Sequence, residues 1–113
     1  MQIYVLSNCD KCRAALKWLR GEGIDFKSRD IRKDGIDANV ISAAIGSLGW
    51  HAVLNRRSTS WRELGKAERK DIDEAKALKL IVANSTLMKR PLFVLDETYL
   101  TGFDDNVKQA ILG

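Results

Sequence analysis

The stretch QIYVLSNCDKCRAALKWLRG (residues 2–21) decides the fold. Its beginning, QIYVL (2–6), is short, apolar and rich in β-branched and aromatic residues, which is typical of a buried strand. The next two residues, SN, are common at helix starts, and apolar residues then recur at i, i+3, i+4 and i+7, the spacing of one helix face. The pattern therefore predicts a strand that leads directly into a helix over residues 9–20.

Further strands are expected on either side of the middle of the chain. One is predicted over IDFKSRDI (24–31), and a strand–helix–strand unit of this kind holds its two strands parallel. Near the carboxyl end, RPLFVL (90–95) and YLTG (99–102) flank the short turn DET, which predicts an antiparallel hairpin. Asp104 or Asp105 then caps a final helix. The predicted order is thus βαβ in one half and ββα in the other.

The middle of the chain is predicted to be helical. WHAVL (50–54) forms one short turn, Ser60 and Glu63 form a capping box, and Asp73 caps a helix over 74–84. The apolar side chains expected on the buried faces of these helices are Ile36, Val40, Ile41, Ala44, Ile45, Leu48, Leu78, Ile81 and Val82. These helices separate the βαβ half from the ββα half.

Composition and charge limit the class of protein. The chain has 113 residues, which suits one domain, and it is 45% hydrophobic and 30% charged. Its net charge is +4, and the basic residues are mixed with acidic ones, whereas nucleic-acid binders concentrate charge on one face. We therefore expect no direct nucleic-acid partner. No apolar run is long enough to span a bilayer and no signal peptide is evident, so we expect a cytoplasmic protein without a membrane partner. We also expect the protein to be a monomer.

Cys9 and Cys12 are the only cysteines, and they stand three positions apart where the first helix begins. In the cytoplasm such a pair more often serves redox or metal chemistry than structural stapling. A zinc site needs four ligands, or three and a water, and the chain offers two cysteines and one histidine, His51. We therefore expect no metal site and interpret the two cysteines as a redox-active pair.

Cys9 is the predicted nucleophile. Unpaired backbone N–H groups and the positive end of the helix dipole lie at a helix start, where a thiol pKa falls to ~3.5–7.5 in favourable cases. Lys11 and Arg13 are near in sequence, with Arg13 expected to point away. Cys12 has two interpretations: it is a small hydrophobe on the buried helix face, or it resolves a mixed disulfide formed at Cys9.

A CxxC pair between a strand and a helix of a βαβ unit is typical of the thioredoxin-like fold. In that fold a proline before the third strand lies against the cysteine site, and the only proline here, Pro91, opens RPLFVL. We predict a cis Arg90–Pro91 bond; the alternative is a trans proline at a strand start. The predicted fold class is α/β: one domain with a thioredoxin-like βαβ–ββα core over about 1–33 and 87–113, and a helical insertion over about 37–84.

Several motifs together resemble the arsenate reductase (ArsC) family over essentially the whole chain: YVLSNCDKC, LGWHAVLNRRSTSWREL and LMKRPLFVLDETYLTGF. The order NCD, DGID, LGW, VLNRRSTSWR and KRP is similar to that of its YffB branch, whereas the CxxC pair is similar to its Spx branch. The resemblance implies a thioredoxin fold with a helical insertion. It also implies a cysteine nucleophile at the helix start, which Cys9 matches.

The resemblance further implies roles for residues around this cysteine. Of three arginines that hold the oxyanion in the arsenate reductases, Arg90 matches one, and the other two fall at Asn55 and Gly102 here. Arg57 lies close to the first of these positions. It either pairs with the glutathione carboxylate or stabilises the Cys9 thiolate, or it is a surface arginine. Arg57, Arg90 and Pro91 form the expected substrate-binding set. Because each charge-assisted bond matters when a dianion is desolvated, arsenate should bind poorly.

The leading hypothesis is a cytoplasmic thiol–disulfide oxidoreductase, a glutathione-dependent thiol reductase with Cys9, Cys12 and Arg90 as its catalytic residues. No bound cofactor is expected. Glutathione is the expected co-substrate, a thiol or disulfide compound the substrate, and glutaredoxin a further partner. The alternative is a redox-sensing transcriptional regulator of the Spx type that binds RNA polymerase. Arsenate reduction ranks third.

Overall fold

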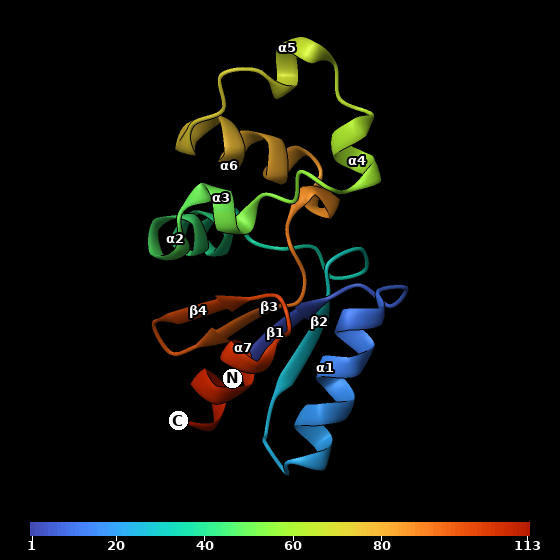
Figure 1. The fold of residues 1–113 in the computed structure, drawn as a ribbon, viewed down its shortest axis with the longest axis vertical. Helices are drawn as coiled ribbons and strands as arrows, with labels where there is room; N and C mark the ends of the chain where they lie inside the picture. The colour runs from blue at the N-terminus through green and yellow to red at the C-terminus, as the bar shows by residue number, and fades with distance from the viewer. The chain divides into compact units, whose positions relative to one another are not determined.

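The computed structural model describes residues 1–113 of the chain. The chain divides into two compact units: a sheet unit (Met1–Gly35 with Arg90–Gly113) and a helical unit (Ile36–Lys89). Each unit has its own secondary structure, strands in the first and helices in both (Figure 1). None of the helices combines the length and the apolar character that crossing a bilayer demands.

The sheet unit is built on four strands in the order β2-β1-β3-β4. β1 pairs in parallel with β2 and antiparallel with β3, and β3 pairs antiparallel with β4. The elements of this unit, in chain order, are β1 (Gln2–Val5), α1 (Asp10–Gly21), β2 (Lys27–Asp30), β3 (Leu92–Leu95), β4 (Thr98–Thr101) and α7 (Asp105–Leu112). The predicted βαβ–ββα core is confirmed.

Helices α1 and α7 cover one face of this sheet (Figure 1). Alternation along β1 sends Ile3 and Val5 to that face, and Ile3 lies opposite Phe93 of β3. The buried cluster between the helices and the sheet consists of Ile3, Val5, Cys12, Ala15, Leu19, Phe93 and Val107. Because Cys12 belongs to this cluster, the first turn of α1 is anchored to the sheet.

The hairpin and the last helix follow the predicted pattern. Leu95 and Thr98 pair across the strands, which leaves a two-residue turn in which Asp96 has φ 51°. The Asp104 carboxylate accepts a hydrogen bond of 2.9 Å from the backbone N–H of Val107 and so caps α7. The antiparallel hairpin and the Asp104 cap are both confirmed.

The helical unit contains only short helices. They are α2 (Ala38–Leu48), α3 (Trp50–Val53), α4 (Thr59–Arg62), α5 (Lys66–Arg69), α6 (Glu74–Ala83) and the 3₁₀ helix η1 (Ser85–Leu87). Helix α2 packs against α3 and α6, and α6 packs against η1. Asp73 caps α6, as predicted, by accepting a 2.8 Å hydrogen bond from the backbone N–H of Lys76. The helical insertion between the two halves of the sheet is confirmed.

The capping box predicted at Ser60 and Glu63 is wrong. Ser58 caps α4 instead, because its Oγ accepts a hydrogen bond of 3.1 Å from the backbone N–H of Trp61. The Ser60 hydroxyl lies 2.6 Å from Oγ1 of Thr86, a residue 26 positions further along the chain. A tertiary contact therefore uses the side chain that the sequence pattern assigned to a local cap.

Two further expectations need correction. The strand predicted over 24–31 is shorter, because only Lys27–Asp30 pairs with β1. Val82, predicted in the core, is 52% exposed. Its helix, α6, centres its buried face on Ala77 and Ile81, one turn apart, and Val82 follows Ile81 by about 100° around the helix.

Candidate active site

Cys9 occupies the N-cap position of α1, at the end of the loop that leaves β1. Its backbone is extended, with φ −107° and ψ 119°, and no side chain caps the helix there. The Cys9 N–H donates to the carbonyl of Leu6 at 3.2 Å, and the Cys9 carbonyl accepts from the Arg13 N–H at 3.0 Å. The thiol therefore lies where the first backbone N–H groups of the helix lack helical partners.

The expectation that the SN pair caps the helix is wrong. The turn closed by the Leu6 carbonyl takes up Ser7 and Asn8, so the helix begins one position after Cys9. The consequence is chemical: Cys9 itself takes the N-cap position, which hydroxyl and carboxylate side chains usually occupy.

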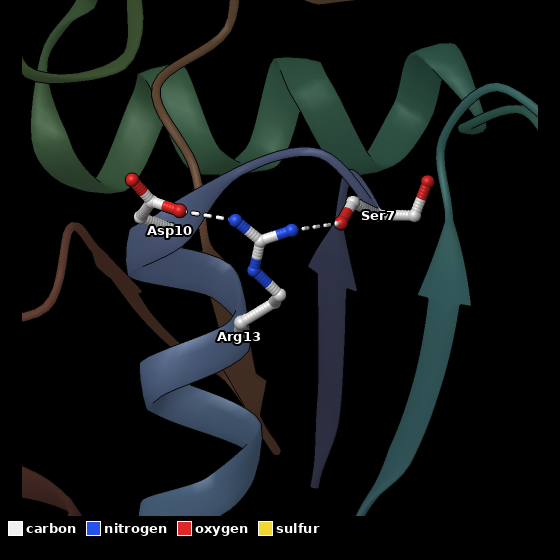
Figure 2. Close-up of polar contacts among 3 residues, drawn as sticks. All are labelled: Ser7, Asp10 and Arg13. Atoms are coloured by element: carbon white, nitrogen blue, oxygen red, sulfur yellow. Dashed lines mark hydrogen bonds and ion pairs between the residues drawn. The ribbon is translucent and has the colours of Figure 1, made fainter.

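Arg13 ties this loop to the first turn of α1 (Figure 2). One guanidinium nitrogen pairs with the carboxylate of Asp10, and the other donates to the carbonyl of Ser7 at 3.3 Å. Both side chains of the ion pair are exposed, so the pair adds little to stability. The pairing directs the Arg13 charge to Asp10, in line with the expectation that Arg13 points away from the sulfur.

Cys12 lies one turn further on and is 1% exposed. Burial is the largest of the effects that raise the pKa of its thiol to about 12. The neighbouring Cys9 also raises this pKa, whereas a backbone hydrogen bond from Leu6 and the charge of Arg90 lower it. Both cysteines are free thiols. Cys12 is thus a neutral thiol at physiological pH, packed in the core and able to donate its proton to a hydrogen bond.

Cys9 has the opposite character. Partial burial alone raises the pKa of its thiol, but hydrogen bonds from the backbone N–H and the thiol of Cys12 lower it. The charge of Arg90 and a hydrogen bond from its guanidinium lower it as well, and together these effects outweigh burial. The pKa of Cys9 is therefore below its ordinary value, which favours the thiolate, the nucleophilic form of cysteine.

The pairing of β1 with β3 explains why Arg90 lies beside Cys9. Tyr4 of β1 is opposite Leu92 of β3, so the start of β3 adjoins the end of β1 from which the cysteine loop emerges. Arg90 and Pro91 immediately precede this start, and the bond between them is cis, as predicted. The half-buried Arg90 is in this way placed next to the first turn of α1.

Two positions associated with an anion site by resemblance carry no charge in this chain. The Gly102 N–H donates to the Pro91 carbonyl at 3.0 Å, so Gly102 lies beside the proline without offering a cation. Asn55 belongs to the helical unit, where its side chain accepts from the backbone N–H of Arg57 at 3.0 Å. Arg57 is exposed in that unit, and its part in substrate binding stays a prediction.

The structure therefore brings together Cys9, Cys12 and Arg90, and Pro91 follows Arg90 through the cis bond. Two contributors were missed from the sequence: the Leu6 backbone, which contacts both cysteines, and the Asp10–Arg13 pair. The i, i+3 spacing of opposite charges could have indicated that pair. No group of three or more histidine, cysteine or acidic side chains is arranged to hold a metal ion.

Comparisons with known proteins agree with this architecture. The model of the ArsC family matches residues 4–111. A protein of Haemophilus influenzae named "Uncharacterized protein" is 39% identical over 108 residues, 96% of this chain and 95% of the relative. The solved structure of the YFFB protein has a TM-score of 0.94 and 33% identity, and the match covers 99% of this chain and 98% of that one.

A regulator is also among the relatives. "Global transcriptional regulator Spx 2" of Lactococcus lactis is 26% identical over 112 residues, which cover 97% of this chain and 84% of the relative. The matches to the family model, to the relatives and to the solved structure thus extend over nearly the whole chain. They include both the thioredoxin-like core and the helical insertion. From its fold, its cysteine site and these matches, the chain belongs to the ArsC family.

Proposed function

We propose that the protein is a thiol–disulfide oxidoreductase that uses Cys9 as its nucleophile and glutathione as its co-substrate. The observation that carries this proposal is the environment of the Cys9 sulfur. It lies at the amino end of α1, receives hydrogen bonds from Cys12, and is adjacent to the Arg90 guanidinium, so its pKa is lowered. A lowered pKa and partial exposure are what distinguish reactive cysteines from structural ones.

The reaction begins with a mixed disulfide between the substrate and glutathione. The Cys9 thiolate attacks the glutathione sulfur, so a Cys9–glutathione disulfide forms while the original disulfide breaks. The substrate leaves as a thiolate and takes a proton from solvent. Arg90 is positioned to hold the negative charge near Cys9 before the attack.

A second thiol then restores Cys9. The thiolate of another glutathione molecule attacks the glutathione sulfur bound to Cys9, which yields oxidised glutathione and the Cys9 thiolate. Alternatively Cys12 gives up its proton and its thiolate attacks the Cys9 sulfur, while glutathione leaves as a thiolate and takes up a proton. Two further glutathione molecules then reduce the resulting Cys9–Cys12 disulfide. In both routes one disulfide is reduced and one molecule of glutathione disulfide is produced, so electrons balance.

The remaining site residues receive supporting roles in this proposal. Arg90 binds anionic substrate, and the backbone beside Pro91 flanks it. For Arg57 we keep the role predicted from the sequence, the binding of a glutathione carboxylate. The protein carries no cofactor of its own, and glutaredoxin is a further partner for regenerating the thiol. We place the protein in the cytoplasm, where glutathione is kept reduced. Arsenate is a poor candidate substrate, because Asn55 and Gly102 supply no cations.

The test is turnover coupled to glutathione reductase. Purified protein, reduced glutathione and a glutathionylated peptide should consume NADPH, and the Cys9→Ser variant should lose this activity almost completely. Mass spectrometry after incubation with oxidised glutathione should find the adduct on Cys9. Lys11→Gln, which removes a nearby exposed charge, serves as the matched control and should retain activity. Activity that persists without the Cys9 sulfur would rule out the proposal.

A second candidate function is redox-dependent binding of RNA polymerase. It is favoured by the similarity to the Lactococcus lactis Spx 2 regulator over 97% of this chain. Co-elution of the protein with purified bacterial RNA polymerase, in its reduced and oxidised forms, tests this function. Binding in one redox form only, combined with no turnover on glutathionylated peptide, would replace the enzyme proposal with the regulator.

A further inference from the structure

A second charged site lies in the helical unit, within residues that the thiol chemistry does not use. A shallow hollow of about 410 Å³ is lined by Trp61, Lys66, Arg69 and Lys70. This volume falls in the range of small-molecule sites, about 300–1,000 Å³. Three of the four lining side chains are cations, and no carboxylate is among them. The lining of the hollow therefore carries a concentrated positive charge next to one indole ring.

Acidic side chains nearby are directed elsewhere. Glu68 lies between two of the cations in sequence, but its carboxylate accepts a 3.0 Å hydrogen bond from the Gly65 N–H and lines a different hollow, next to α6. Neither Lys66 nor Arg69 forms an ion pair with a carboxylate of the protein. The positive charge of the hollow is thus not neutralised from within the unit.

Arg69 provides the observation that points to a ligand. Its Nε is buried and makes no hydrogen bond within the protein. A buried donor without an acceptor is costly, more so on a charged group, and such cases in native proteins call for an explanation. Because Arg69 lines the hollow, a small rotation of its side chain would turn Nε towards an acceptor oxygen supplied by a ligand there and remove this cost. A guanidinium also presents a planar fork that matches the geometry of phosphate oxygens.

The segment carrying these cations is held by contacts to α6. The Lys76 ammonium donates to the carbonyl of Ala67 at 2.9 Å and also to the carbonyl of Lys70. Both acceptors belong to the stretch that forms α5 and its C-cap. The backbone bearing Arg69 is in this way tied down, so the lining side chains start from a defined position, which lowers the entropic cost of binding.

From these observations we propose that the hollow binds a phosphate ester that carries a planar ring, the chemistry of a free mononucleotide. The phosphate lies among Lys66, Arg69 and Lys70, and the ring stacks against Trp61. The three cations can donate charge-assisted hydrogen bonds to the phosphate, and the indole face can stack on any of the bases. This site is independent of the function proposed for Cys9.

The three tryptophans of the chain make the binding directly observable. Titration of the full-length protein with adenosine monophosphate, followed by the indole N–H signals in two-dimensional NMR, should shift the Trp61 signal saturably. The Trp18 and Trp50 signals should stay in place. Adenosine should bind at least tenfold more weakly, because it lacks the phosphate that three cations recognise. Equal binding of adenosine, or no saturable shift, would overturn the proposal.

Three variants separate a specific site from diffuse surface charge. Arg69→Gln should weaken binding of adenosine monophosphate by about tenfold or more, and Arg69→Lys should lose several-fold because it keeps the charge without Nε. Arg62→Gln removes an exposed charge next to Trp61 outside the hollow, and should change the affinity by less than about twofold. Equal losses in Arg62→Gln and Arg69→Gln would overturn the proposal.

Two controls keep the test decisive. If Arg69→Gln fails to fold, Lys66→Gln replaces it, because Lys66 is exposed and lines the same hollow. A short single-stranded oligonucleotide is titrated as well. If the affinity of the oligonucleotide rises in proportion to its number of phosphates, the positive surface binds nucleic acid and the mononucleotide proposal is overturned. An affinity no higher than that of adenosine monophosphate supports the proposal.

Discussion

At the scale of single residues, two cysteines one helical turn apart acquire opposite chemistry. Cys9 receives hydrogen bonds and faces a guanidinium, whereas Cys12 is packed among aliphatic side chains. Burial penalises the charged form of each thiol, but only Cys9 has enough donors around it to reverse that penalty. The neutral Cys12 thiol becomes one of those donors, so the two pKa shifts belong to one coupled pair.

Arg90 should account for a measurable part of the Cys9 acidity. In Arg90→Gln the positive charge and its hydrogen bond are lost, so the pKa of Cys9 should rise. The midpoint of iodoacetamide alkylation against pH, measured at Cys9 by mass spectrometry, should therefore move to higher pH. Alkylation at a fixed pH below that midpoint should slow accordingly.

Lys11→Gln is the matched control for this measurement. Lys11 is an exposed cation two positions from Cys9, and it is not among the groups that lower the pKa of Cys9. The midpoint of Cys9 alkylation in the Lys11→Gln variant should coincide with that in the unchanged protein. If Lys11→Gln and Arg90→Gln shift the midpoint equally, the acidity of Cys9 comes from general positive charge and the assignment of Arg90 fails.

At the scale of elements, α1 and α7 serve the site by anchoring it to one sheet face. The first turn of α1 is held from within by Cys12 and from outside by the Arg13 contacts to Asp10 and Ser7. Val107 of α7 joins the same buried cluster. The position of the Cys9 sulfur thus depends on the packing of residues that lie several positions away from it.

The cap of α7 should have a definite effect on stability. Asp104→Ala removes the carboxylate that accepts from the Val107 N–H, and the free energy of unfolding should fall by about 1 kcal/mol, within a range of ~0.5–2. Urea denaturation followed by circular dichroism measures this change. Asp105→Asn, which removes a first-turn charge without a cap hydrogen bond, should cost less, about 0.5 kcal/mol. The reverse order of effects would refute the assigned cap.

At the scale of the whole molecule, the buried Cys12 thiol couples folding to pH. The unfolded chain releases this proton near pH 9, whereas the folded protein holds it until about 12. The stabilisation is therefore fully present below pH 9 and is lost as pH rises towards 12. The lowered pKa of Cys9 acts with the opposite sign, in a window below its ordinary value, so the two effects do not overlap.

Between pH 9 and 11 the free energy of unfolding should fall more steeply in the unchanged protein than in Cys12→Ala. One proton accounts for at most about 1.4 kcal/mol per pH unit, and the titration of lysines and tyrosines cancels in the comparison. Urea melts at several pH values measure both slopes. Parallel slopes would mean that Cys12 is not held neutral in the folded protein.

Much of the fold was predictable from local patterns. The alternation in QIYVL, the helix periodicity that includes Cys12 and Ala15, the DET turn and the Asp73 and Asp104 caps each depend on residues close in sequence. Errors arose where distant residues compete with a local pattern: Ser60 bonds to Thr86 and leaves the cap to Ser58. Val82 fits a helical stripe but lies outside the face that α6 buries.

By itself, the sequence determined the order of strands and helices in the sheet unit and which cysteine lies at the helix start, because turn residues, periodicity and spacing act over a few positions. Only the tertiary structure decided the chemistry of that cysteine. The antiparallel pairing of β1 with β3 brings Arg90, 81 positions away in the chain, beside Cys9. Cys12 is buried in a cluster that includes Phe93 and Val107, which are also far from it in sequence. Acidity depends on charge and solvent exposure in three dimensions, which no local pattern of residues contains.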